Sequence, residues 1–300
     1  MKKNRGSYAP PPKLTKLTVK EKALLMEFLL SKMGGMSRST VKSLLSHRQV
    51  SVNDKVTTQF DTPLRINDRV TINHSHGNVE LSHPKLRIIY EDSDLIIVEK
   101  KEGLLTVTTG TGLEITAFSI LKNYVKKSSA ANKIYTVHRL DRETSGVLLF
   151  SKNRDIQHFL RNNWHEVVTR RVYSAVVEGK VLKEKDQIVS WLTENEVSLK
   201  IKSASYDNGG KQAITNYKRV KFTEDYSLLE IELETGRKNQ IRVHMESIGH
   251  PIVGDRKYGS TVNIGRLALH ARILEFYHPV TGELVHFESP VPKELFKLVK

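Results

Sequence analysis

The sequence contains no cysteine among its 300 residues. Disulfide bonds, thiol nucleophiles and thiolate metal sites are therefore excluded, and stability must come from packing alone. Long apolar runs are also missing, because no stretch reaches the length of about 18 residues that a transmembrane helix needs. The Met1–Arg5 start is not followed by an apolar segment either. We expect a cytoplasmic protein that has no membrane partner.

Acidic side chains are in the minority. The sequence has 33 Asp and Glu against 48 Lys and Arg, which gives a net charge of +15. An excess of this size attracts polyanions, so nucleic acid is the first candidate partner. Residues 1–80 hold 14 basic and 6 acidic side chains. This concentration of positive charge favours a binding role for the N-terminal part.

The length allows one large domain and one small one. Residues 1–13 are polar and basic and include three consecutive prolines, which predicts a flexible basic tail. The composition then predicts a small domain over residues 14–73, a polar linker over 74–86 and a large domain over 87–300. The linker contains His74 and His76, but no third ligand at a fixed spacing, so we expect no metal site.

Residues 14–73 show two helical patterns followed by short strands. Apolar residues recur at helical spacing over Leu24–Leu29, and Ser37 is expected to cap a second helix. Arg38 and Lys42 lie four residues apart, so they share an outer face of that helix, with Arg48 nearby. Strands are expected at residues 50–52, 64–66 and 70–72.

The strings Ser37–Leu45 and Gln49–Lys55 resemble the ribosomal-protein-S4-type RNA-binding domain. The resemblance implies that this part is a small S4-like α/β domain whose Arg38, Lys42 and Arg48 contact RNA. The alternative is that these side chains form an ordinary solvated helix face.

From residue 87 onward the pattern predicts an α+β domain. Short apolar runs typical of strands lie at 88–90, 95–98, 147–150, 172–177, 228–233 and 267–269. Helical patterns lie near 114–126, 155–163 and 238–248. Strands outnumber helices and do not alternate regularly with them, which indicates a mainly antiparallel mixed sheet with flanking helices.

Asp141 lies in a polar loop between two apolar runs. A carboxylate is ionised at neutral pH and can act as a nucleophile without a base to activate it. Arg139 and Arg142 flank it, and a nearby cation would keep it ionised even in a dry pocket. Taken alone, however, an aspartate between two arginines is most often a surface ion pair.

The string from His138 to Lys152 is similar to the central motif of the RluA-like pseudouridine synthases. The resemblance implies that Asp141 is the nucleophile and that Arg139 fills the gap left when the target base leaves its helix. His138 and Arg142, in the same string, are further expected RNA contacts.

Two later segments resemble the same family in the expected order. Arg171–Gly179 resembles the segment that supplies the active-site tyrosine, which implies Tyr173, and an aromatic ring suits a flipped base. Glu234–His244 resembles the third motif, and this implies that Arg242 pairs with the nucleophile. Expected RNA contacts in that motif, at the start of a helix opening near residue 238, are Arg237, Lys238 and Gln240.

Two positions depart from the family pattern. Glu102 stands in a loop where members have alanine, and Asn239 stands where a histidine is usual. We therefore expect the loop that contains Glu102, and the RNA contacts near Gln240, to differ from the family pattern.

The resemblance as a whole implies the isomerisation of uridine in RNA on a pseudouridine-synthase fold. The reaction is redox-neutral and uses no metal and no cofactor; Gly110–Gly112 also lacks the spacing of a nucleotide-binding loop. An S4-like domain favours large-subunit ribosomal RNA over transfer RNA as the substrate. The rival functions are a non-catalytic RNA-binding or ribosome-assembly protein, and a glycoside hydrolase that pairs Asp141 with Glu143.

Overall fold

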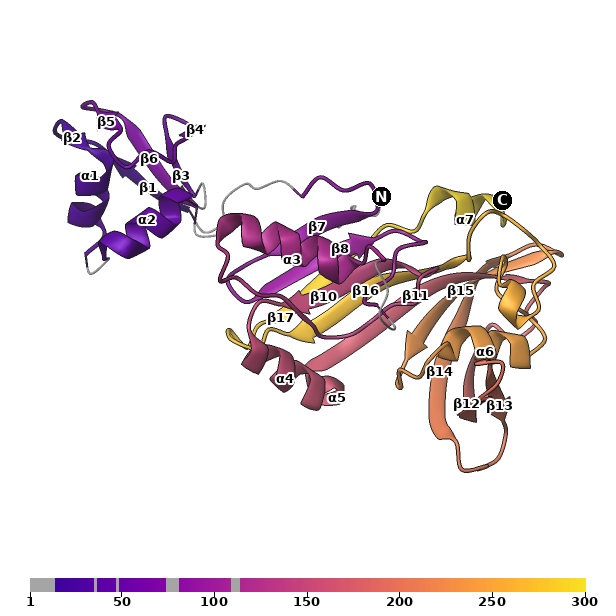
Figure 1. Cartoon of the computed structure of the whole chain (residues 1–300). Coiled ribbons are helices and arrows are strands. Elements are labelled where there is room, and N and C mark those ends of the chain that lie inside the picture. The colour runs from indigo at the N-terminus through magenta and orange to yellow at the C-terminus, as the bar shows by residue number, and fades with distance from the viewer. Residues whose placement is uncertain (1–13, 35–36, 47–48, 74–80, 109–113) are drawn as a thin grey trace.

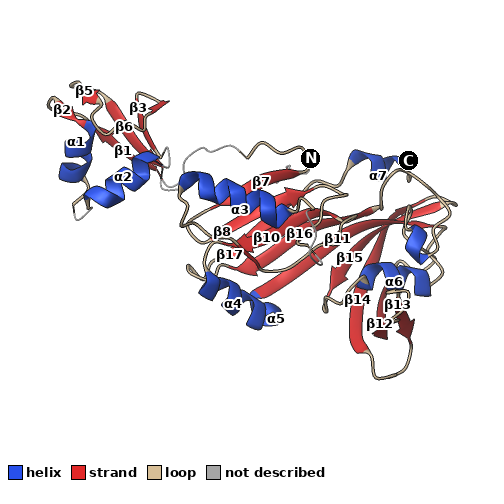
Figure 2. Cartoon of the chain, in the orientation of Figure 1, coloured by secondary structure: helices blue, strands red, loops and turns tan. Residues whose placement is uncertain are grey.

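The computed structural model describes residues 14–34, 37–46, 49–73, 81–108 and 114–300. Two sets of elements are present, with separate sheets and separate buried apolar clusters (Figures 1 and 2). The predicted tail, Arg48, His74 and His76 lie outside the described residues, so their predicted roles have no structural counterpart here. Within the described ranges, no helix is long and apolar enough to cross a bilayer.

The first set of elements spans residues 14–73. Its helices and strands are β1 (Leu14–Thr18), β2 (Ala23–Leu24), α1 (Leu25–Lys32), α2 (Arg38–Ser46), β3 (Val50–Val52), β4 (Lys55–Val56), β5 (Pro63–Leu64) and β6 (Arg69–Asn73). The main sheet has the strand order β1-β6-β3-β4, and all its pairs are antiparallel. Leucine, valine and phenylalanine side chains from both helices and from the sheet form one buried cluster.

Local sequence explains the turns of this unit. The Thr40 backbone N–H donates to the Ser37 hydroxyl over 3.1 Å, so Ser37 caps α2 as predicted. Asn53 and Asp54 join β3 to β4 with φ angles of 49° and 66°, a left-handed conformation that asparagine and aspartate tolerate better than most residues. Arg38 and Lys42 are exposed on α2. The two predicted helices are thus confirmed, and each predicted strand lies within two residues of an observed one.

The second set of elements forms an 11-stranded sheet. Its strands are β7 (Leu86–Glu91), β8 (Leu95–Lys100), β9 (Tyr135–Thr136), β10 (Ser145–Ser151), β11 (Val168–Glu178), β12 (Lys185–Glu194), β13 (Ile201–Ala204), β14 (Lys211–Phe222), β15 (Tyr226–Leu233), β16 (Leu269–Tyr277) and β17 (Leu284–Glu288). The helices are α3 (Ala117–Ser128), α4 (Arg154–Asn162), α5 (Trp164–Val167), α6 (Gln240–Ser247), the 3-10 turn η1 (Arg256–Tyr258) and α7 (Lys293–Lys297).

The long path of the sheet runs β13-β12-β14-β15-β11-β16-β10-β8-β7, with β17 paired to β16 and β9 to β10. Only the β10–β16 pair is parallel among the described strands. The expected α+β class and mainly antiparallel mixed sheet are therefore confirmed. The strand predicted at residues 267–269 was placed too early, because β16 begins at Leu269 and continues to Tyr277.

Around β10 the sheet is covered by helices on both faces, and alternate side chains of the strand point to opposite faces. Leu148 and Phe150 of β10 pack in a cluster with α3, whereas Val147 and Leu149 pack in another with α4 and α5. Because both faces are covered, all seven residues of β10 are buried. This rigid strand carries the loop that contains Asp141.

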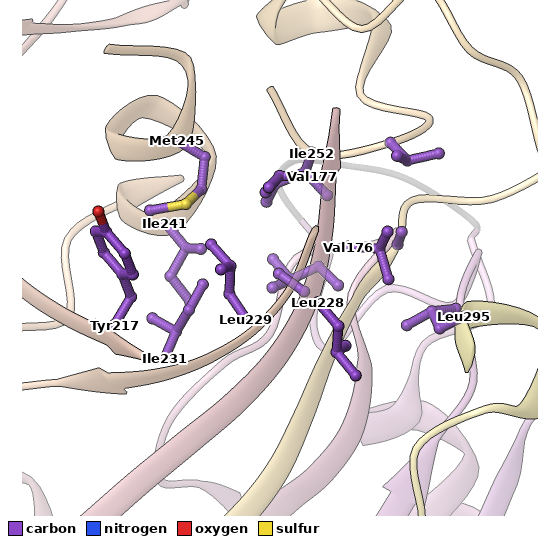
Figure 3. Close-up of a cluster of buried hydrophobic side chains, with 14 of the residues drawn as sticks. Val176, Val177, Tyr217, Leu228, Leu229, Ile231, Ile241, Met245, Ile252 and Leu295 are labelled. Carbon is purple, nitrogen blue, oxygen red and sulfur yellow. The ribbon is translucent and has the colours of Figure 1, made fainter. Parts of the chain in front are cut away.

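The other half of the sheet is covered by α6. Ile241 and Met245 of α6 face Tyr217, Leu229 and Ile231 of β14 and β15 (Figure 3). The cap of α6, Asn239, has a left-handed backbone with φ 54°, so the helix begins at Gln240 rather than near Lys238 as predicted. This packing fixes the amino-terminal end of α6, which carries Arg242.

Candidate active site

Asp141 lies in a turn that is fastened on both sides. The turn is closed by the Thr144 backbone N–H, which donates to the Asp141 carbonyl over 3.2 Å. Before it, the Thr106 hydroxyl donates to the Leu140 carbonyl (2.8 Å) and accepts from the Leu140 N–H (3.1 Å). After it, the Arg142 carbonyl accepts from the backbone N–H of Gly103 over 2.8 Å. The backbone of the turn is thus held in place by the loop that follows β8.

A buried lysine also holds this turn. Lys100 is 0% exposed, and its Nζ donates to the carbonyls of Leu104 (2.9 Å), Arg142 (3.1 Å) and Lys101 (3.2 Å). Burial lowers its pKa to about 8, and the negative charges of Glu143 and Asp141 oppose that shift. At neutral pH its ammonium therefore remains mostly charged, beside the turn that carries Asp141.

Among the described residues, Arg242 of α6 is the cation nearest to the Asp141 carboxylate. Its Nη1 lies 3.8 Å from Asp141 Oδ2, and its side chain is 13% exposed. Its Nε and Nη2 donate to the two oxygens of Asp255 over 2.6 and 2.7 Å. Burial alone would lower the pKa of Arg242, but the hydrogen bonds and charge of Asp255 outweigh it and raise this pKa. A two-pronged contact of this kind fixes the guanidinium in one plane.

Asn239 completes the surroundings of Arg242. Its Oδ1 accepts from Arg242 Nη1 over 3.3 Å, and its Nδ2 donates to the Tyr258 hydroxyl over 3.0 Å. The Tyr258 ring is fully buried and lies 4.9 Å from the centre of the guanidinium. Asn239, which departs from the family pattern, thus helps to hold Arg242 in place.

Tyr173 and His138 are walls of the same site. Tyr173 lies on β11 opposite Ala271 of β16. Burial raises its pKa, and so does the Asp141 charge, although Arg171 opposes the shift, so its hydroxyl stays protonated at neutral pH. His138 accepts the Leu149 backbone N–H at Nε2 over 3.1 Å. Burial, together with the charge of Arg171, lowers the pKa of His138 to about 3, so the imidazole is neutral.

These side chains surround one cleft of about 440 Å³. Eight of the predicted site residues line it: His138, Arg139, Asp141, Tyr173, Arg237, Lys238, Gln240 and Arg242. Arg139, Arg237 and Lys238 are exposed at the cleft; Lys238 also pairs with Glu194, and Arg237 Nε donates to the Gln212 carbonyl over 3.0 Å. A small concave site with a carboxylate, a fixed guanidinium and a neutral tyrosine suits one nucleoside taken out of a polyanionic strand.

Comparison with known proteins decides the family. Residues 94–247 match the sequence profile described as RNA pseudouridylate synthase. The chain belongs to the RNA pseudouridine synthase family. This synthase is 33% identical over 282 residues to the uncharacterized RNA pseudouridine synthase YlyB of Bacillus subtilis, covering 91% of this chain and 92% of that one.

Two further likenesses agree with that assignment. The ribosomal large subunit pseudouridine synthase D of Neisseria meningitidis serogroup A is 34% identical over 279 residues, which cover 88% of this chain and 74% of that protein. The solved structure of human RNA pseudouridylate synthase domain containing 4 superposes with a TM-score of 0.58 at 22% identity, over 70% of this chain and 90% of that one. The structural likeness shows a shared fold.

Some residues that line the cleft of the synthase were not predicted from the sequence. They are Arg161 and the α5 residues Trp164 and His165, together with Arg171 at the start of β11. Arg171 Nη2 donates to the carbonyls of Leu233 and Glu234 over 3.1 and 2.8 Å. Gly236 makes room for this guanidinium, since a Cβ there would lie 2.8 Å from Arg171 Nη1. Arg171 opens the segment that resembles the family's tyrosine motif, but the sequence did not show that its side chain points into the cleft.

Two further expected RNA contacts, Gln240 and Arg142, also have partners within the protein. Gln240 is 2% exposed; its Oε1 accepts from Thr235 and the Arg237 N–H, and its Nε2 donates to Ile214 and Thr215. All four positions of its amide are used within the protein, so we remove Gln240 from the expected RNA contacts.

Arg142 does not line the cleft. Its side chain is half-exposed and its Nη2 donates to Glu114 over 2.6 Å. Glu143 is exposed and also lies outside the cleft lining, so it does not form a second catalytic carboxylate beside Asp141. In the part of the chain that the structure describes, no group of three or more His, Asp or Glu side chains could hold a metal ion.

Proposed function

We propose that this synthase isomerises specific uridines in large-subunit ribosomal RNA, with Asp141 as the nucleophile. The observation that carries the proposal is the place of the Asp141 carboxylate in the cleft, 3.8 Å from the Arg242 guanidinium. The relatives named as large-subunit synthases favour ribosomal RNA. Transfer RNA remains the alternative substrate. The expected location is the cytoplasm, where ribosomal RNA is found.

The reaction exchanges one bond for another within a single nucleotide. The bond from uracil N1 to the ribose breaks, the uracil turns in the cleft, and its C5 bonds to the same ribose carbon. The proton on C5 is lost and N1 gains one, so atoms and electrons balance without an oxidant. In this proposal Asp141 acts as the nucleophile and Arg242 keeps its charge compensated. The Tyr173 ring supplies a wall on which the uracil can stack.

The target base must leave its helix, which costs a few kcal/mol. We propose that Arg139, exposed at the cleft, fills the vacancy. Arg237 and Lys238 would bind the flanking phosphates. We further propose that residues 14–73 form an S4-like RNA-binding domain. Its exposed Arg38 and Lys42, on α2, would add sequence-independent contacts to the phosphate backbone.

The substitution Asp141→Asn tests the nucleophile. It keeps the size of the side chain but removes the charge, so we expect the release of tritium from 5-tritiated uridine RNA to be abolished. RNA binding and the melting temperature should stay unchanged. The control is Glu196→Gln, which removes the charge of an exposed carboxylate outside the cleft lining and should keep wild-type activity. Full activity of Asp141→Asn would overturn the assignment.

The RNA target is tested separately. Pseudouridines are mapped in ribosomal and transfer RNA from cells that lack this protein. We expect one or more sites to disappear from the large-subunit RNA and to return when the wild-type chain is supplied. Loss of a site in transfer RNA alone would select the alternative substrate.

A further inference from the structure

The loop after β8 contains a charged residue with a specific partner. Glu102 lies in this loop beside Gly103, whose backbone N–H fastens the Asp141 turn at Arg142. The Glu102 carboxylate is 33% exposed, and its Oε2 lies 3.0 Å from Arg266 Nη1. Glu102, which departs from the family pattern, is thus ion-paired with Arg266 of the same chain.

Arg266 joins three separate segments of the chain. Its side chain is 7% exposed. Its Nη2 donates to the Ser145 hydroxyl over 2.6 Å, and Ser145 directly follows the turn that carries Asp141. Its Nη1 lies 3.0 Å from Glu102 and 3.0 Å from Glu294 of α7. One guanidinium therefore ties the loop after β8 and the C-terminal helix to the end of the Asp141 turn.

The Asp141 carboxylate depends on its backbone for its position. The contact with Arg242 measures 3.8 Å, which is longer than a hydrogen bond and fixes direction poorly. The turn is fastened at Leu140 and Arg142 by the loop after β8 and at Ser145 by Arg266. A shift of about 1 Å in a reacting group can cost roughly 100-fold in rate.

We propose that Glu102 is a positioning residue, which acts through Arg266 to lock the loop after β8 against the far end of the Asp141 turn. The ion pair connects the two sets of contacts that hold the turn. The inference rests on the proposed role of Asp141 as the nucleophile.

Glu294 provides a matched comparison for this role. Its Oε1 lies at the same 3.0 Å from the same Nη1 atom, but it is 54% exposed and belongs to α7, which does not fasten the turn. Removing either carboxylate leaves the other beside Arg266, so neither change strands a buried charge. Of the two carboxylates, only Glu102 ties the loop after β8 to Arg266.

The experiment compares full-length Glu102→Gln and Glu294→Gln. Both keep side-chain size and remove one charge. The substrate is 5-tritiated RNA isolated from cells that lack the protein, and kcat and KM are measured by tritium release. We expect Glu102→Gln to lower kcat about tenfold with KM nearly unchanged, since geometry and not binding is affected. Glu294→Gln should change neither. Equal losses in the two variants, or no loss in Glu102→Gln, would overturn the proposal.

Hydrogen exchange of the free protein gives a second readout that needs no catalysis. Glu102→Gln should exchange the backbone amides of residues 138–145 several-fold faster than the wild type, and Glu294→Gln should not. If Glu102→Gln exchanges faster but the wild-type chain releases no tritium, the positioning role is supported and the proposed function fails. Unchanged exchange in Glu102→Gln, beside an active wild type, would refute the positioning role alone.

Discussion

At the scale of single residues, the site is arranged in layers around one carboxylate. Asp141 is partly accessible, whereas Arg242 and the residues that hold it are increasingly buried, and the Asp255 side chain is 1% exposed. Asp255 was not among the predicted site residues, and nothing in the sequence showed that it lies against Arg242. A contact between residues on a helix and on a following loop depends on how the loop turns back, which residue spacing does not encode.

The substitution Asp255→Ala tests this second layer. It would leave the mostly buried Arg242 without its two-pronged partner, so we expect a loss of about 3–5 kcal/mol in the free energy of unfolding. The activity should also fall, because the guanidinium is then free to turn away from Asp141. Urea unfolding measures the first effect.

The control for Asp255→Ala is Glu224→Ala, which removes a partner of Lys180 that is 82% exposed. This surface pair should contribute about 1 kcal/mol or less. If the two substitutions lower the free energy of unfolding equally, the buried Arg242–Asp255 pair contributes no more to stability than the exposed pair.

At the scale of elements, the sequence predicted the strands and helices whose apolar residues follow one simple pattern. Strand β10 is buried on both faces and reads as one apolar run, and α3 and α4 match the helical spacing near 114–126 and 155–163. Strands β12 and β13 were missed, since half of their side chains face solvent and many of these are charged or polar. The 12-residue strand β14 was not predicted either.

The junction of β10 and β16 requires a glycine. Gly146 has φ 119°, and a Cβ there would lie 2.0 Å from the Ala271 carbonyl oxygen. We expect Gly146→Ala to force the two strands apart and to lower the free energy of unfolding by about 3 kcal/mol or more. The purified variant should melt well below the wild type by circular dichroism.

Gly34→Ala is the comparison for Gly146→Ala. A Cβ at Gly34 meets nothing within 4 Å, so this change should alter stability by less than about 1 kcal/mol. An unaltered melting temperature in Gly146→Ala would show that β10 and β16 can move apart without a loss of stability.

At the scale of the whole molecule, the stability should depend on pH through buried histidines. His244 and His270 are 0% and 1% exposed, and burial lowers the pKa of each to about 4. Each folded pKa lies below the ordinary value of 6.5, so between these values the unfolded chain binds more protons. Stability is therefore full above pH 6.5 and falls as the pH drops toward 4.

Urea unfolding at pH 7.5 and pH 5 measures this dependence, and the midpoint should be lower at pH 5. His244→Gln should show a smaller difference between the two conditions, because one of the titrating groups is gone. His158→Gln, at an exposed position on α4, should keep the wild-type difference. A midpoint that is the same at both pH values would contradict the expectation.

The order of strands in the large sheet has a consequence for synthesis on the ribosome. Strand β16 lies between β10 and β11, although it follows β10 by more than 100 residues in the chain. The two halves of the cleft therefore cannot be joined until residue 277 has left the exit tunnel. Such distant pairing is slow to form. The nascent chain therefore carries Asp141 through more than 100 residues of further synthesis without an assembled cleft, and the site forms only near the end of translation.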